Sequence, residues 1–198
     1  HKTTFPNGLR LITAPKKGAE SITMFILTRA GSKYETREQN GISHFLEHLL
    51  FKGTKKRTSH DIATIIDSIG GISNAFTAQE YTGYWVKATP GQFSIVTDLL
   101  SDIFLNARLA PQDIEKERGV VLEEIKLYND MPIEKIGNVF TNLLYGDQPA
   151  GWEILGRPEV IRSLQQKDLL NYIRKHYAAS STIIVVAGDL KPAIIKRE

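Results

Sequence analysis

The chain has 198 residues, 41% of them hydrophobic and 24% charged, and it is long enough to bury a core. Its 25 basic residues are nearly balanced by 22 acidic ones, which argues against nucleic acid as a partner, and no apolar run approaches the ~20 residues of a membrane span. Cysteine is absent, so disulfides and thiolate ligands are excluded, and any bound metal needs histidine and carboxylate ligands.

β-Strand patterns occur near both ends of the chain and in its middle. These segments are rich in β-branched and apolar residues, and turn residues bound them. In the segment 81–89 the side chains alternate, so Tyr84 and Val86 share one face while Trp85 and Lys87 share the other. The predicted strands are 9–14, 22–30, 72–77, 81–89 and 182–187.

Helical patterns fill most of the remaining chain. Gly41 begins the first helix and Gly53 ends it. Ser59 is the expected N-cap of the second helix, and Pro111 suits the first turn of the longest one. The basic segment 52–57 lacks interleaved aromatic residues, so we interpret it as a solvated turn rather than a phosphate-binding patch. The predicted helices are 41–51, 61–69, 92–106, 111–129, 133–145, 158–164 and 167–177.

These elements predict one α+β domain spanning residues 1–198, with a largely antiparallel sheet of about five strands and helices packed on one face. No repeat, low-complexity segment or linker divides it. A last helix begins at Pro192, but it has too few residues to bury a face before the sequence stops at Glu198. We therefore expect the domain to be cut short at its C-terminal end.

Residues 44–48 read HFLEH, which places two histidines and a glutamate on the first predicted helix. Positions i and i+4 lie one above the other, so His44 and His48 converge on one point and Glu47 lies beside them. Two imidazoles can hold zinc, and a neighbouring carboxylate can deprotonate water that the ion activates. The alternative is a polar cluster held by hydrogen bonds. Burying three polar side chains on an otherwise apolar helix costs free energy unless a metal ion or hydrogen-bond partners compensate for the lost water.

A catalytic zinc needs a third protein ligand, and without cysteine this must be a carboxylate or another histidine. The best carboxylates lie on the predicted helix 111–129, which carries several glutamates. The remaining histidine candidates are His1, His60 and His176.

Glu117 and Glu124 lie seven residues apart, nearly two helical turns, and therefore share a face, whereas Glu123 points about 100° away from Glu124. This arrangement suits one metal ligand and one supporting carboxylate. Spacing alone does not show whether Glu123 or Glu124 is the ligand. It also does not distinguish a metal site from a solvated acidic face. In the latter case the partners would be Lys116, Arg118 and Lys126.

The segment 41–54, GISHFLEHLLFKGT, resembles the signature of the insulinase, pitrilysin and mitochondrial processing peptidase family of inverted-motif zinc peptidases. The resemblance is closest to the bacterial and mitochondrial processing peptidase branch. It continues through NAFT at 74–77, ERGVVLEE at 117–124 and VAGD at 186–189, and it therefore covers nearly the whole chain.

The resemblance implies zinc as the cofactor, with His44, His48 and Glu124 as ligands, because the family's third ligand lies about 76 positions after the second histidine. It implies that Glu47 is the general base, which takes a proton from water and returns it to the leaving amine. Glu117 matches a second glutamate that supports catalysis near the site.

The resemblance also implies an edge strand, residues 73–77, onto which the substrate peptide adds through backbone hydrogen bonds. Asn74, Ala75 and Phe76 would then bind substrate, and Phe51 would line the pocket just after the scissile bond. Ordinary strand and core positions are the alternative for Asn74 and Phe76.

Members of the family are built from two or four such halves, and a later half supplies an arginine and a tyrosine to the site. This chain matches the zinc-bearing half alone, so the expected partners are a peptide substrate and a second homologous half or dimer partner, without nucleic acid or membrane. The sequence leaves the compartment open, with bacterial cytoplasm or periplasm favoured over the mitochondrial matrix.

Zinc-dependent endopeptidase activity is the function that these features favour. A non-catalytic or incomplete peptide-binding subunit is the first alternative, because the second half is missing. A zinc hydrolase acting on a non-peptide amide or ester is the second.

Overall fold

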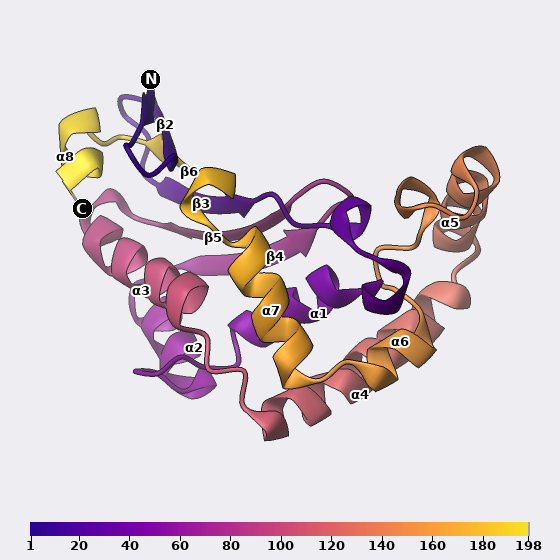
Figure 1. Ribbon diagram of the computed structural model, residues 1–198. Helices are drawn as coiled ribbons and strands as arrows, with labels where there is room; N and C mark the ends of the chain where they lie inside the picture. Colours follow the sequence, from indigo (N-terminus) through magenta and orange to yellow (C-terminus); the bar gives the residue numbers. More distant parts are fainter. Residues whose placement is uncertain (198) are drawn as a thin grey trace.

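The computed structural model describes residues 1–197, whose strands form one sheet in the order β1-β2-β6-β3-β5-β4 (Figure 1). Only β2 and β6 pair in parallel, and every other neighbouring pair is antiparallel. The predicted, largely antiparallel sheet is confirmed. It has six strands rather than about five, and the strand that was not predicted is β1, whose three residues are too few to show a pattern. The strands are β1 Lys2–Thr4, β2 Arg10–Pro15, β3 Ile22–Thr28, β4 Ile72–Thr77, β5 Thr82–Ala88 and β6 Thr182–Gly188.

All the predicted helices are present, with ends that differ by one or two residues. The expected N-cap Ser59 is wrong, because Ser59 is the first residue of α2 and Thr58 precedes it as the cap. Thr58 and Asp61 exchange hydrogen bonds in a capping box, which pairs residues three apart. The helices are α1 Ile42–Leu50, α2 Ser59–Ser68, α3 Phe93–Asn106, α4 Pro111–Asn129, α5 Pro132–Tyr145, α6 Pro158–Ser163, α7 Gln166–His176 and α8 Pro192–Arg197.

The helices α1, α2, α3 and α7 lie against one face of the sheet, and α4 and α6 form a further layer below them in Figure 1. Burial alternates accordingly along β3, where Ile22, Met24 and Ile26 are buried and the residues between them are half-buried. In β5 the predicted alternation holds, since Tyr84 and Val86 are fully buried. The expectation of helices on one face is therefore confirmed.

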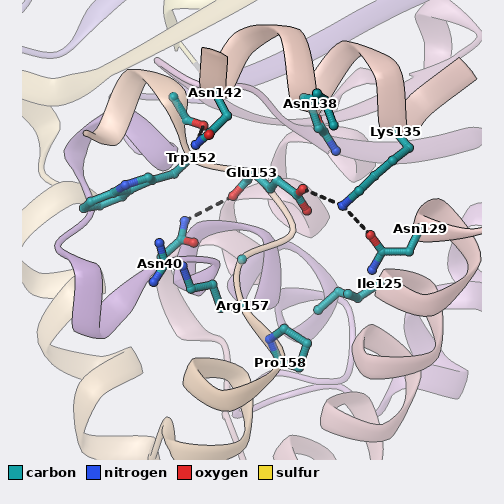
Figure 2. Close-up of a pocket in the computed structure, with 13 residues that line it drawn as sticks. Asn40, Ile125, Asn129, Lys135, Asn138, Asn142, Trp152, Glu153, Arg157 and Pro158 are labelled. Carbon is teal, nitrogen blue, oxygen red and sulfur yellow. Dashed lines mark hydrogen bonds and ion pairs between the residues drawn. The ribbon is translucent and has the colours of Figure 1, made fainter. Parts of the chain in front are cut away.

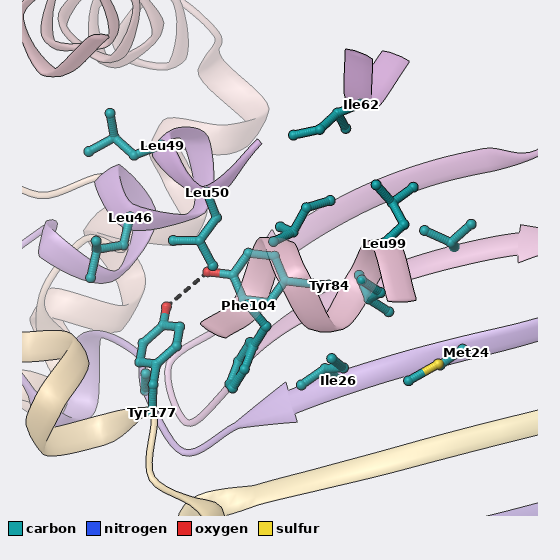
Figure 3. Packing of buried hydrophobic residues seen from close by; sticks show 14 of the residues in the cluster. Met24, Ile26, Leu46, Leu49, Leu50, Ile62, Tyr84, Leu99, Phe104 and Tyr177 are labelled. Atoms are coloured by element: carbon teal, nitrogen blue, oxygen red, sulfur yellow. Dashed lines mark hydrogen bonds between the residues drawn. The ribbon is translucent and has the colours of Figure 1, made fainter. Parts of the chain in front are cut away.

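The core joins the first helix, α1, to this sheet (Figure 3). Tyr84 of β5 is fully buried, and its hydroxyl shares a 2.8 Å hydrogen bond with that of Tyr177. Leu46 and Leu50 of α1 pack in the same cluster as Phe104 of α3. Because α1 is anchored through one apolar side, its other side is held in a fixed direction toward α4.

The start of α1 is set by a close approach of two glycines. Gly41 has a left-handed backbone (φ +97°), and a Cβ on it would lie 2.8 Å from the Cα of Gly156. Gly156 is also left-handed (φ +79°), and a Cβ there would lie 2.3 Å from the carbonyl oxygen of Asn40. This contact places the segment before α6 directly against the N-terminus of α1.

A buried carboxylate, Glu35, holds the same helix end. Its oxygens accept hydrogen bonds from the backbone N–H groups of Gly41 (2.7 Å) and Ser43 (2.9 Å) and from the side chain of Asn40 (3.1 Å). Glu35 is 4% exposed, so these donors have no water as a substitute. It acts as a cap for α1 from outside the helix, supported by the helix dipole.

Replacing this cap is expected to destabilise the whole chain. Glu35→Ala leaves the two buried backbone donors unsatisfied at ~1–3 kcal/mol each, while Asn40 keeps its bond to the Glu153 carbonyl, so we expect the free energy of unfolding to fall by about 2 kcal/mol or more. Urea denaturation measures it, and Glu38→Ala, which removes an exposed carboxylate nearby, is the matched control. A loss below about 1 kcal/mol in Glu35→Ala would contradict the capping role.

The basic segment 52–57 is only partly a solvated turn. Lys55 and Lys56 are exposed as expected, but Arg57 donates to the buried Asp102 at 2.6 Å, and Lys52 reaches the buried Glu117 at 3.0 Å. The prediction was wrong for these two side chains because their partners lie on α3 and α4, distant in sequence. Within residues 1–197, no helix is both long and apolar enough to cross a membrane.

Candidate metal centre

Two helices bring three metal-binding side chains together. His44 and His48 project from α1 toward Glu124 of α4, and one ligand atom from each of the three lies within 4.8 Å of the others. Nε2 of His44 is 3.6 Å and Nε2 of His48 is 3.2 Å from Oε2 of Glu124. Ligands around a tetrahedral ion with ~2.1 Å bonds lie about 3.4 Å apart, so this donor set fits zinc.

Glu47 lies beside this group and is tied to the sheet. Thr77 of β4 donates a 2.5 Å hydrogen bond to its Oε2. Burial raises the pKa of Glu47, although the Thr77 hydrogen bond opposes the shift. A carboxylate with a raised pKa is a better match for accepting and returning a proton near pH 7.

The pKa values of the two histidines are shifted in opposite directions. Burial, followed by the charge of His48, lowers the pKa of His44 to about 4, so its ring is neutral at pH 7 and offers a lone pair to a metal. Burial also acts to lower the pKa of His48, but the hydrogen bond and charge of Glu124 outweigh it and raise the value. The hydrogen bond from His48 lowers the pKa of Glu124, which keeps this carboxylate ionised.

A second carboxylate, that of Glu117, lies close to the His48 ring on the side of its other nitrogen, Nδ1. Oε2 of Glu117 is 3.5 Å from Nδ1 of His48, and its Oε1 is 3.0 Å from Nζ of Lys52. Glu117 is 2% exposed, and Lys52 is the cation that balances it. The row Lys52–Glu117–His48 therefore places a carboxylate near the second ring nitrogen of one candidate ligand, the position that partners of metal-bound histidines occupy.

Removing Lys52 is expected to weaken metal binding without touching a ligand. Lys52→Met leaves the buried Glu117 without its cation, so we expect zinc affinity to fall ~10–100-fold, the usual effect of losing a ligand's supporting partner. Competition with a chromophoric chelator measures the affinity. Lys55→Met, an exposed neighbour, is the matched control, and equal affinities in the two variants would show that Lys52 has no such role.

The other candidate ligands lie elsewhere. Glu123 is exposed and pairs with Lys126 at 2.7 Å. His60 is exposed on α2, and the ring of His176 stacks on Tyr172 with centroids 4.3 Å apart. Among residues 1–197, His44, His48 and Glu124 are the group of three close enough to share an ion. The solvated-face alternative therefore describes Glu123 but not Glu117 or Glu124.

Two cavities flank Glu47 along β4, and both are lined by Glu47 and Ala75. One, of about 330 Å³, also contacts Phe51 and Asn74. The other, of about 350 Å³, also contacts Phe76. Its remaining wall comes from α1, β4, α4, α5 and the segment before α6, namely His44, Thr77, Glu124, Tyr128, Glu134, Asn138, Ile154 and Leu155.

The edge strand β4 runs between these cavities. Its one neighbour in the sheet is β5, so its other edge is unpaired within the described residues. Asn74 is exposed, whereas Ala75 and Phe76 are half-buried, and the Phe76 ring meets Tyr81 edge to face at 5.9 Å. Asn74, Ala75 and Phe76, which were predicted to bind substrate, thus lie at the edge of the sheet next to Glu47, whereas Phe51 lies at the C-terminal end of α1.

Sequence reasoning missed three residues that shape the site: Lys52, Thr77 as a partner of Glu47, and Glu35. Thr77 was recognised as part of a strand, but no local pattern shows that this strand passes over α1. The single available signal for Lys52 was its position four residues after His48, which places both on one helical face.

An H-x-x-E-H helix, a carboxylate from a second helix and an open edge strand are the features that characterise the inverted-motif class of zinc peptidases. The sequence profile of the insulinase family, peptidase family M16, matches residues 10–156, and the chain belongs to this family.

Similar proteins found by sequence and by structure both support this family membership. The chain is 36% identical over 193 residues to the uncharacterized zinc protease YmxG of Bacillus subtilis, covering 98% of this chain and 47% of that protein. It is 38% identical over 189 residues to the probable mitochondrial-processing peptidase subunit beta of Arabidopsis thaliana, covering 96% and 36%. The crystal structure of a protease from Helicobacter pylori matches with a TM-score of 0.94 at 28% identity, covering 100% and 48%. The chain therefore spans about half the length of these relatives or less.

Proposed function

We propose that this chain is the zinc-bearing half of an endopeptidase that hydrolyses peptides bound in extended conformation. The observation that carries the proposal is the convergence of His44, His48 and Glu124 within 4.8 Å, next to a carboxylate that is hydrogen-bonded to an edge strand. The family membership supports it, since relatives across the bacteria carry the name zinc protease.

Zinc, when bound to the three ligands, supplies a Lewis acid that polarises the peptide carbonyl and lowers the pKa of water toward ~7. Glu47 accepts the proton of the attacking water and delivers it to the amine nitrogen as the C–N bond breaks. The Thr77 hydrogen bond fixes the Glu47 carboxylate for both transfers. Glu117 holds the ring of His48 in its binding orientation.

The substrate adds to β4 as an extra strand, because the free edge of β4 offers unpaired backbone groups beside Glu47. Asn74, Ala75 and Phe76 then contact the peptide, whose successive side chains alternate between faces. The two cavities on either side of Glu47 take side chains that flank the cleaved bond, and Phe51 forms a wall of one of them.

A second candidate function is an incomplete, peptide-binding subunit that needs another half for turnover. The observation that favours it is the length of the chain, which spans 47% of the B. subtilis relative and 48% of the H. pylori structure. In this case zinc and peptide bind, but the groups that hold the substrate from the opposite side come from elsewhere.

Metal analysis followed by a peptide assay separates these functions. We expect one zinc per chain after dialysis, and cleavage of an internally quenched peptide that stops on adding 1,10-phenanthroline and returns on adding zinc. Zinc and peptide binding without cleavage would favour the incomplete subunit. Absence of zinc from a folded chain would overturn the proposal.

A further inference from the structure

A further polar cavity lies under helix α5, and its wall contains neither Glu47 nor any of the three candidate ligands (Figure 2). We term it the α5 cavity. Its wall comes mainly from α4, α5 and the segment 151–157. Its volume of about 430 Å³ exceeds that of either cavity beside Glu47 and lies within the ~300–1,000 Å³ that is usual for ligand sites.

Four asparagines line the α5 cavity, namely Asn40, Asn129 of α4, and Asn138 and Asn142 of α5. Within the described part of the chain, each keeps at least one amide atom that forms no hydrogen bond. Asn129 accepts from Lys135 at 2.6 Å but leaves its Nδ2 unused, and Asn142 donates a long hydrogen bond of 3.5 Å to a carbonyl but leaves its Oδ1 unused. The wall therefore offers both donors and acceptors to a ligand.

The buried amide of Asn40 contains an acceptor that is not used. Asn40 is 1% exposed, and its Nδ2 donates to the carboxylate of Glu35 and to the carbonyl of Glu153, both at 3.1 Å. Because both partners are acceptors, the amide cannot be turned round, and its Oδ1 has no donor among the described residues. An unpaired buried acceptor costs free energy until a donor reaches it.

The charged side chains of the α5 cavity already have partners. Nζ of Lys135 donates to Oε1 of Glu153 at 3.2 Å, and Arg157 lies 3.5 Å from Asp147. A charged ligand would compete with these pairs, whereas a neutral ligand that donates and accepts hydrogen bonds leaves them intact. A peptide unit is such a group, because its N–H and C=O complement the C=O and NH₂ of an asparagine amide.

The spacing of the asparagines on α5 suits an extended peptide. Asn138 and Asn142 are four residues apart, so they lie on one side of the helix with a rise of ~6 Å between them. Two residues of an extended chain span ~6.6–6.8 Å, and peptide units repeat their orientation with that period. Neighbouring units of equal orientation therefore meet the two amides in turn.

The α5 cavity adjoins the cavity that holds Glu47, because Asn138 lines both. The chain just after β4 also approaches it. Nε2 of Gln79 donates to the carbonyl of Ala150 at 3.4 Å, and the next residue, Gly151, borders the α5 cavity. A peptide that follows the edge of β4 past Thr77 is thus directed toward the α5 cavity.

We propose that the α5 cavity is a subsite for the main chain of the substrate, away from the cleaved bond, in which the asparagine amides hydrogen-bond peptide units. The inference rests on the proposed function for the nature of its ligand. It predicts that the chain prefers long peptides to short ones. Side chains in this part of the peptide are not selected, because recognition of the backbone tolerates many sequences.

Fluorescence anisotropy with labelled peptides tests this subsite while 1,10-phenanthroline prevents cleavage. A short core peptide is compared with versions that carry a tail of glycine and serine at its N-terminal or its C-terminal end. We expect the tail at one end alone to lower the dissociation constant about tenfold, the effect of one or two hydrogen bonds. N-methylation of the amides in that tail should abolish the gain.

Substitutions locate the effect in the α5 cavity. Asn129 and Asn142 line this cavity but not the one that holds Glu47, and both are exposed, so Asn129→Leu and Asn142→Leu leave the core and the metal centre untouched. We expect each variant to lose most of the gain from the tail while binding the core peptide as the wild-type chain does. Asn171→Leu, which changes an exposed asparagine on α7, is the matched control and should keep the full gain.

The subsite would be overturned if neither tail improved binding or if no peptide bound at all. It would also be overturned by a gain that survives N-methylation or both leucine substitutions. Zinc content and turnover are measured separately, so the two proposals fail independently. A zinc-free chain that binds the tailed peptide through Asn142 would overturn the peptidase but keep the subsite, and a zinc-loaded peptidase without the gain would do the reverse.

Discussion

Glu47→Gln is expected to lower kcat by ~10²–10⁴-fold while the chain keeps its zinc, because general acid–base catalysis contributes about that factor. The amide has the shape of the carboxylate and can still accept the hydrogen bond from Thr77, but it cannot take a proton from water. The rate is measured on the preparation that cleaves the quenched peptide, whether the chain alone or with its partner.

The control for this variant is Glu20→Gln, which changes an exposed carboxylate in the turn between β2 and β3. Zinc content measured in parallel separates loss of the base from loss of the metal. Wild-type turnover in a zinc-loaded Glu47→Gln variant would exclude Glu47 as the base. A zinc-free variant would instead show that Glu47 is needed to form the site.

Glu124→Ala is expected to weaken zinc binding by more than 100-fold. It removes one of three ligands, whereas loss of a supporting partner alone costs ~10–100-fold. It also leaves the two histidine rings, 4.7 Å apart, without the carboxylate that lies within 3.6 Å of each. Chelator competition measures the affinity, and circular dichroism verifies the fold.

Glu123→Ala is a closely matched control, since it removes the same side chain one residue away on the same helix. Glu123 is exposed and contacts Lys126, so we expect zinc affinity within about twofold of wild type. If Glu123→Ala and Glu124→Ala lost zinc alike, the site would depend on the charge of α4 rather than on a defined ligand.

Much of the fold could be predicted because its signals are local. The alternation of β5 and the proline at the start of α4 placed these elements within about two residues. Three residues of β1 carried no periodicity, and the choice of Thr58 over Ser59 as a cap depended on which side chain reaches Asp61. Short strands and helix ends are set by hydrogen bonds that composition does not specify.

The α5 helix shows the limit of the same reasoning. Its residues predict a helix, and its apolar stripe would ordinarily predict burial. The structure turns the stripe outward, because Lys135, Asn138 and Thr141 face the rest of the chain. Periodicity defines the two sides of a helix but not which side meets the body of the protein.

The sequence by itself determined that His44, Glu47 and His48 share one side of α1 and that Glu117 and Glu124 share one side of α4, since both follow from 3.6 residues per turn. The tertiary structure alone decided that these two sides face each other, that Lys52 balances Glu117 and that Thr77 reaches Glu47. Helical geometry relates residues a few positions apart, whereas contacts across 30 or 76 positions depend on how the sheet, α1 and α4 pack around one core.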